Sequence, residues 1–215
     1  MVRELRAKVG GSGLAITALA AVLVAAGIAW LDAPVASVSY RLISANDTVE
    51  RYAHRIPDAL FWIVVLVTAA CWTTYSALTR KGFHDLRTRF LRVCGTGVPA
   101  SFATKSLLQW VFGRSDPLAW VLYDQVPQFF WFSWGPRVGS FPSGHMTVFT
   151  TLATALWLHY PRYKPVYVGF LALLGLALVV TTYHYFSDVI AGAYLGGVIG
   201  MAARRGMERA RLSPR

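Results

Sequence analysis

Six stretches of about 20 predominantly apolar residues take up most of this chain and limit the folds that it can adopt. Each stretch is long enough to cross a bilayer as a helix, which satisfies its backbone polar groups internally. Hydrophobic residues make up 55% of the sequence and charged residues 14%, an unusual balance for a soluble domain. We expect an all-α, polytopic membrane protein, a six-helix bundle that forms one domain over residues 1–215. The expected spans are residues 13–31, 59–79, 91–113, 142–160, 165–183 and 186–203.

The net charge of +11 is divided unevenly among the segments that join these stretches. Segments 32–58 and 114–141 carry both signs, whereas the others are mainly basic, which predicts that both termini are cytoplasmic and that these two segments lie outside. We expect an inner-membrane protein whose basic tail meets anionic lipid, with no nucleic-acid partner because no basic face is organised for one. Stretch 13–31 follows basic residues as a signal peptide would, but its length favours a retained helix. The basic segments are residues 3–8, 80–92, 162–164 and 204–215.

Other local features predict a plain membrane bundle. Cys71 and Cys94 fall inside expected helices, where we expect them to pack as small apolar side chains without a disulfide. No ligand spacing indicates a metal or a cofactor, so we expect neither, and the oligomeric state stays open. Asp47 and Glu50 have the spacing of a capping box, which predicts a short helix at the outer interface.

The last stretch combines small residues with an ionisable pair. Gly192, Gly196 and Gly200 recur every four residues, which predicts a face that approaches another helix closely. His184 and Asp188 are also four apart, so the carboxylate can accept the ring proton of the imidazole. Ionisable side chains are energetically costly inside a membrane. These two therefore indicate either a catalytic site or a buried polar pair that joins two spans.

A second histidine follows a helix-start signal in the segment Phe141-Pro142-Ser143-Gly144-His145. Proline suits a first helical position, and glycine leaves the backbone bare, so the helix from His145 onward presents free amide hydrogens to the outer face. Such a helix end favours an anion. By itself, the segment is equally consistent with an ordinary helix start.

Together the two segments resemble the type 2 phosphatidic acid phosphatase superfamily, in its membrane-bound bacterial form. The resemblance covers about residues 100–200. It implies that His184 attacks phosphorus to form a phosphohistidine, that Asp188 holds the other ring nitrogen, and that His145 protonates the leaving oxygen. It also implies that Ser143 and the amides of Gly144 and His145 stabilise the transferring phosphoryl group, without a metal.

The chain departs from the family pattern at three cationic positions. Gln109 stands where a lysine is usual, and Asp116 and Leu178 stand where arginines are usual. Three other cations are candidates for substrate phosphate binding. Arg114 has a planar fork that can bind phosphate in two places, Lys105 lies one helical turn before Gln109, and Arg137 precedes Pro142 by five residues.

The segment between the third and fourth stretches is crowded with aromatic side chains, which either form an interfacial belt or contact substrate. They are Trp120, Tyr123, Phe129, Phe130, Trp131, Phe132 and Trp134. The leading hypothesis is an integral membrane phosphatase that hydrolyses a lipid phosphate or diphosphate at the outer face. The alternatives are a phospholipid headgroup transferase that uses the same histidines, and a transporter or assembly protein whose histidines line a polar pathway.

Overall fold

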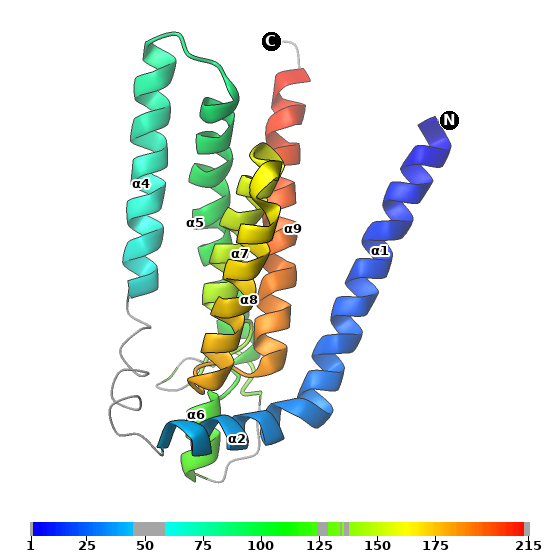
Figure 1. Ribbon diagram of the computed structural model, residues 1–215, viewed down its shortest axis with the longest axis vertical. Helices are drawn as coiled ribbons and strands as arrows, with labels where there is room; N and C mark the ends of the chain where they lie inside the picture. Colours follow the sequence, from blue (N-terminus) through cyan, green and yellow to red (C-terminus); the bar gives the residue numbers. More distant parts are fainter. Residues whose placement is uncertain (1, 45–58, 124–128, 134, 136–137, 213–215) are drawn as a thin grey trace.

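The computed structural model describes residues 2–44, 59–123, 129–133, 135 and 138–212, and within them the regular structure is helical. Helices α4, α5, α7, α8 and α9 run side by side along the longest axis, α1 leans away from them, α2 lies across one end, and α6 lies at that same end (Figure 1). Helix α7 is central, since it packs against α5, α8 and α9. The helices are α1 (Val2–Ala26), α2 (Asp32–Ser44), α4 (Ala59–Arg80), α5 (Leu86–Phe112), α6 (Pro117–Tyr123), α7 (Gly144–His159), α8 (Lys164–Val180) and α9 (Phe186–Leu212).

Four segments among the described residues are long and apolar enough to cross a membrane, so the all-helical membrane fold is confirmed. They are Gly13–Ser44, Leu60–Arg80, Pro161–Val180 and Phe186–Glu208. The two other expected spans, 91–113 and 142–160, form helices α5 and α7 but fall outside this group. Helix α7 has 16 residues and is about 24 Å long at ~1.5 Å per residue, which is shorter than the hydrocarbon core. Helix α5 carries arginines in its first turns.

The N-terminal segment departs from the expected helix-then-loop arrangement. Helix α1 passes through one turn of π-helix, Gly27–Leu31, directly into α2, so residues 32–44 are helical rather than a loop. Gly27 permits the contact that places this turn, because a Cβ there would lie 2.9 Å from the Cβ of Ser187 in α9. The π-turn brings Asp32 against the start of α9, where it is 1% exposed. The helix predicted from Asp47 lies outside the described residues.

The expected glycine face is confirmed and packs on α7. A Cβ at Gly192 would lie 2.5 Å from the carbonyl oxygen of Ser143, and one at Gly200 would lie 2.7 Å from the Cβ of Thr154. Gly196 is at least as tightly packed, against Thr147 and Thr150. The two backbones can approach this closely because the side chains are absent, and the contact draws the two sequence motifs together.

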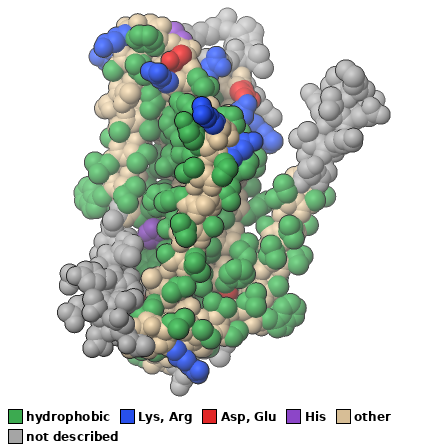
Figure 2. Space-filling view, in the orientation of Figure 1, with side chains coloured by type: hydrophobic (Ala, Val, Ile, Leu, Met, Phe, Trp, Pro, Cys, Tyr) green, Lys and Arg blue, Asp and Glu red, His purple; other side chains and the backbone are tan. Residues whose placement is uncertain are grey.

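The surface is consistent with a lipid-embedded bundle. Hydrophobic side chains cover the middle of the molecule, and most of the visible lysines and arginines gather at the end that holds the α4–α5 turn (Figure 2). Large apolar side chains such as Leu14 and Trp30 are exposed, at 75% and 74%, as lipid-facing residues are. Inside, Cys71 and Cys94 are buried in an apolar cluster with Val93 and Ala155, in the packing role expected of them.

Candidate active site

A cavity of about 470 Å³ opens near the end of the bundle that carries α6, and both sequence motifs reach it. Lys105 and Gln109 come from α5, Gly144 and His145 from the start of α7, and His184 from the turn before α9. The remaining described lining residues are Leu60, Phe61, Phe102, Asp116, Leu118, Val138, Gly139, Ser140, Thr182 and Tyr183.

The start of α7 presents its backbone to this cavity. Ser143 is the N-cap: its hydroxyl accepts from the amide of Met146 at 3.4 Å, and it is buried and absent from the lining. Gly144 and His145 follow at the first helical positions, where amide hydrogens have no partner within the helix. This arrangement favours an anion in the cavity. A helix does begin in this segment, but Pro142 precedes the N-cap instead of standing at a first helical position as predicted, and the phosphate contacts of Ser143 and Gly144 remain predictions.

The two histidines face each other at the cavity. The centroids of His145 and His184 are 6.3 Å apart, and the ring of Tyr183 lies against both, at 5.5 and 4.9 Å. Thr182, whose φ is 52°, shapes the turn that carries His184. The backbone amides of Tyr183 and His184 both donate hydrogen bonds to the carbonyl oxygen of Leu178. The imidazoles, at 7% and 5% exposed, are thus shielded and still line an open cavity.

Asp188 stands behind His184, on the side of its Nδ1 atom. Oδ2 of Asp188 lies 3.7 Å from this nitrogen, which makes no hydrogen bond in the structure. Catalytic hydrogen bonds are often long before substrate binds. The predicted i, i+4 juxtaposition is confirmed. Because Nδ1 faces the carboxylate, Nε2 is the ring nitrogen available to a ligand.

The Asp188 carboxylate is itself held by several donors. Oδ1 accepts from Nη1 of Arg114 at 2.6 Å, while Oδ2 accepts from the hydroxyl of Ser140 and from the amide of Tyr185 at 3.1 Å. The carbonyl of Asp188 accepts from the amide of Ser143 at 3.0 Å, which ties the two motifs to each other directly. The orientation of this carboxylate is therefore determined from three parts of the chain.

Arg114 lies behind Asp188 rather than in the cavity lining. Its Nη2 donates to Oδ2 of Asp32 at 2.7 Å and its Nη1 also donates to the hydroxyl of Ser187 at 2.7 Å. Its plane covers the Tyr185 ring, with Cζ 4.1 Å from the ring centroid. Burial alone lowers the pKa of Arg114, but the charges of Asp188 and Asp32 outweigh this effect and raise the pKa, so the guanidinium stays charged. The described network accounts for its position without a substrate phosphate.

The ammonium group of Lys105 lies beside Gln109, the residue that stands where the family usually has a lysine. Its Nζ donates to Oε1 of Gln109 at 3.1 Å, and a Cβ added to Gly144 would lie 3.4 Å from Nζ. The Gln109 amide in turn donates to the carbonyl of Pro142 at 3.1 Å. The lysine that is one turn early therefore places its ammonium beside the start of α7. Lys105 is the only lysine or arginine among the described lining residues.

Other expectations meet a different outcome. Arg137 and Trp134 lie outside the described residues. Leu178 is buried at 5% exposed, so its side chain supplies no polar contact to the cavity, whereas Asp116 lines it. Among the described aromatic residues of segment 120–134, none lines the cavity. Phe129 and Trp131 pack instead around Phe112, at ring centroid distances of 6.2 and 5.4 Å.

Ser140 and Asp32 both belong to this network, and neither was predicted from the sequence. Ser140 is an ordinary serine in a loop, and nothing in its surroundings in the sequence marks it. Asp32 did carry a signal, because a carboxylate at the end of an apolar stretch is costly unless it is paired. Asp32 accepts from Arg114 and from the amide and hydroxyl of Ser187, at 3.0 and 2.5 Å.

Comparison with known proteins identifies a family and relatives of this chain. The sequence model of the PAP2 superfamily matches residues 90–212, which include both motifs. The chain is 36% identical over 107 residues to a lipid A 1-phosphatase of Rhizobium etli, covering 47% of this chain and 44% of that protein. It is 35% identical over 96 residues to a lipid A 1-phosphatase of Rhizobium johnstonii, covering 42% of this chain and 37% of that protein. The match thus spans less than half the length of either relative.

A solved structure shares the fold. The transmembrane PAP2 type phosphatidylglycerolphosphate phosphatase from Bacillus subtilis superposes with a TM-score of 0.52 over 91% of this chain and 96% of that one. At 18% identity, this likeness shows the fold alone.

Proposed function

We propose that this chain, which belongs to the PAP2 superfamily, hydrolyses a phosphate ester of a membrane lipid through a phosphohistidine intermediate. The observation that carries the proposal is the pairing of His145 and His184 across one cavity, with Asp188 behind the second ring and Lys105 beside the start of α7. In this set His184 is the nucleophile, Asp188 orients it, and His145 is the acid. Lys105 and the start of α7 bind the anion.

In the first step, Nε2 of His184 attacks phosphorus while the bond from phosphorus to the lipid oxygen breaks. His145 gives its proton to the leaving oxygen, so the lipid departs as a neutral alcohol. Asp188 accepts the proton of Nδ1 in a hydrogen bond and stabilises the positive charge that develops on the ring. The products are the dephosphorylated lipid and a phosphoryl group covalently bound to His184.

In the second step, water attacks the phosphohistidine. His145, now neutral, takes a proton from the water as the bond from nitrogen to phosphorus breaks, and inorganic phosphate leaves. Both histidines return to their starting states. No step draws on a group outside the chain other than substrate and water.

The transferring phosphoryl group needs stabilisation where its negative charge is spread over the equatorial oxygens. We assign this role to the ammonium of Lys105 and to the amides of Gly144 and His145, which lie together at the start of α7. Arg137 remains a predicted contributor, and Ser143 contributes by capping the helix.

For Arg114 we propose a positioning role in place of a phosphate contact. Its guanidinium bonds Asp188 and Asp32, and it is 0% exposed. It therefore acts on the reaction through the carboxylate that orients His184. Asp32, outside the residues matched by the family, completes the support by holding Arg114 and Ser187.

We further propose six spans, with α5 and α7 crossing the membrane beside the more apolar helices. Support comes from the packing of α5 and α7 within the bundle. The start of α1 and the end of α9 also lie toward the same end of the molecule (Figure 1). The basic end is then cytoplasmic and the cavity faces the outer side of the inner membrane. Residues 1–215 form a single domain in this arrangement.

The relatives suggest which lipid to test first. Both are lipid A 1-phosphatases, so we propose the 1-phosphate of lipid A as the leading substrate, ahead of other lipid monophosphates and diphosphates. The test is phosphate release by detergent-purified protein from such a panel, with chelator present. Release from lipid A that disappears in His184→Ala supports the proposal. Transfer of phosphoryl to an added alcohol without free phosphate would instead favour the headgroup transferase.

A further inference from the structure

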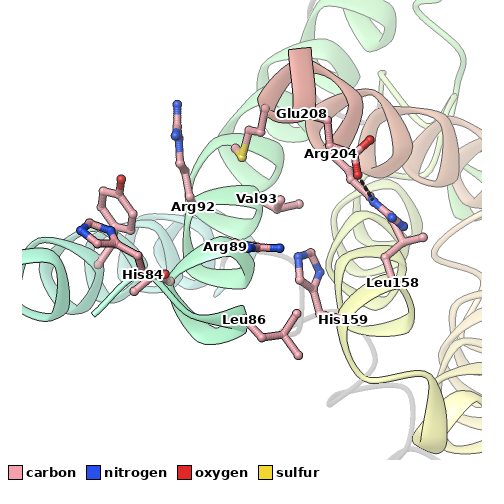
Figure 3. A pocket seen from close by; sticks show the side chains of 12 residues that line it. His84, Leu86, Arg89, Arg92, Val93, Leu158, His159, Arg204 and Glu208 are labelled. Carbon is pink, nitrogen blue, oxygen red and sulfur yellow. Dashed lines mark hydrogen bonds and ion pairs between the residues drawn. The ribbon is translucent and has the colours of Figure 1, made fainter. Parts of the chain in front are cut away.

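A second cavity, of about 230 Å³, lies at the other end of the bundle and shares no lining residue with the first. Three arginines line it, Arg89 and Arg92 from α5 and Arg204 from α9, and the side chains of Arg89 and Arg92 point in different directions (Figure 3). His159, at the end of α7, adds an imidazole toward which the Arg89 guanidinium points. The remaining lining residues are Tyr75, His84, Leu86, Thr88, Val93, Leu158, Met207 and Glu208.

The charges in this cavity are not balanced. Arg204 is paired with Glu208, since its Nε lies 2.9 Å from Oε1. Arg89 and Arg92 have no ion-pair or hydrogen-bonding partner for their side chains within the described part of the chain. Two guanidiniums beside a cavity with no protein anion for them make a site for a ligand that brings negative charge.

An apolar groove adjoins the cavity and lies along the bundle. This groove, of about 510 Å³, shares Arg92 and Met207 with the cavity and runs between α5 and α9 as far as Thr104. From Arg92 to Thr104 it extends about 18 Å, at ~1.5 Å per residue. Its other described walls are Trp72, Thr96, Ala100, Ile199, Ala202, Ala203 and Gly206. A basic pocket beside such a groove is complementary to a molecule with an anionic head and an apolar tail.

We propose that this cavity and groove bind an anionic phospholipid, one that is not the substrate. The phosphate lies against Arg89 and Arg92, and an acyl chain lies along α5 toward Thr104. A zwitterionic headgroup fits less well because its cation meets arginines. The site is at the basic end of the molecule, so the ligand comes from the leaflet opposite the catalytic cavity.

The test is native mass spectrometry of the full chain in detergent, titrated with dioctanoyl phosphatidylglycerol, dioctanoyl phosphatidylcholine or glycerol phosphate. The double variant Arg89→Gln/Arg92→Gln should weaken the tightest binding of phosphatidylglycerol about tenfold or more. The matched control is Arg80→Gln/Arg205→Gln, which removes the same charge from exposed positions at the same end that do not line the cavity. An equal loss in both doubles would show a diffuse surface effect and overturn the proposal.

Two further variants complete the test. One distinguishes binding of a lipid from binding of a free anion, and the other distinguishes this site from the catalytic cavity. Ala100→Phe fills the exposed groove without touching the arginines, and it should weaken phosphatidylglycerol binding while leaving the weak binding of glycerol phosphate unchanged. Glycerol phosphate that binds as tightly as the lipid would contradict the proposal. Lys105→Met, in the other cavity, should leave phosphatidylglycerol binding intact, and a loss there would place the lipid in the catalytic site instead.

Discussion

Nη1 of Arg114 donates to Oδ1 of Asp188 across 2.6 Å, and both side chains are 0% exposed. The pair has a third member, because Nη2 of the same guanidinium meets Asp32 at 2.7 Å. A cation between two buried carboxylates offsets the negative charge of both. For the reaction, the important consequence is that Asp188 stays an acceptor for the imidazole of His184.

Arg114→Lys tests this positioning role. A lysine keeps the charge but cannot bond both carboxylates in the same plane, so Asp188 should lose its fixed orientation. We expect kcat to fall about tenfold to a hundredfold, as for other residues that orient a reactive group, with KM within about twofold. Asp32→Asn should show the same pattern more weakly. A rise in KM with unchanged kcat would instead mean that Arg114 binds the substrate phosphate.

Asp188→Asn tests the orientation of the nucleophile. The variant should fold and keep part of its affinity for phosphate, but lose most of its turnover, because orienting His184 matters chiefly in the transition state. Steady-state kinetics on a lipid phosphate with a thermal melt of the same sample measures both quantities. Turnover at the wild-type rate would remove Asp188 from the mechanism.

Gly144→Ala tests the contact between the start of α7 and Lys105. The new Cβ would lie 3.1 Å from Cδ and 3.4 Å from Nζ of the lysine, so the flexible side chain must move away from the helix end. We expect weaker binding of inorganic phosphate as a product inhibitor and a higher KM for substrate. The control is Gly169→Ala, where an added Cβ has nothing within 4 Å. An unchanged inhibition constant would place the phosphate elsewhere in the cavity.

Gly196→Ala tests the close packing of α9 on α7. An added Cβ would lie 2.8 Å from the Cβ of Thr150 and closer still to the carbonyl of Thr147, so the helices must separate. Overpacking of this kind costs about 1–3 kcal/mol, which should lower the melting temperature in detergent. Gly197→Ala, one residue further on, meets nothing within 4 Å and should melt like the wild type. Equal melting temperatures in all three proteins would contradict the tight interface.

The pH dependence of kcat/KM tests the pairing of the histidines. His184 must be neutral to attack, so protonation at low pH removes activity, while His145 must be protonated to release the lipid, so its deprotonation at high pH removes activity. The profile should therefore rise and fall around an optimum. In His145→Gln the alkaline limb should disappear along with most of the rate. A wild-type profile that changes in only one direction would count against this assignment.

Much of this arrangement could be predicted from local pattern. The helix start before His145, the spacing of His184 and Asp188, and the glycine face of α9 all depend on residues a few positions apart, and the structure confirms each of them. Lys105 was also predicted to come near the site from one turn away, which depends only on helical rise.

What sequence reasoning missed depends on contacts between distant segments. Asp32 meets Ser187 from 155 residues away, and Ser140 meets Asp188 from 48 residues away, so neither contact leaves a local pattern. Arg114 was predicted to grip phosphate from its chemistry alone, yet two carboxylates that fold against it occupy its guanidinium. Segment 32–58 was expected to be a loop because it joins two apolar stretches, yet residues 32–44 form helix α2, whose first residue, Asp32, is buried against Arg114 and Ser187.

The most direct test of the account is to detect the covalent intermediate. The protein would be mixed with radiolabelled lipid A 1-phosphate, quenched in alkali within one turnover, and separated on a denaturing gel. We predict label on the wild type that is stable in alkali and lost in acid, as a phosphohistidine is, and no label on His184→Ala, while His159→Ala labels normally. Labelling that persists in His184→Ala, or turnover by the wild type without any labelled protein, would contradict a mechanism through His184.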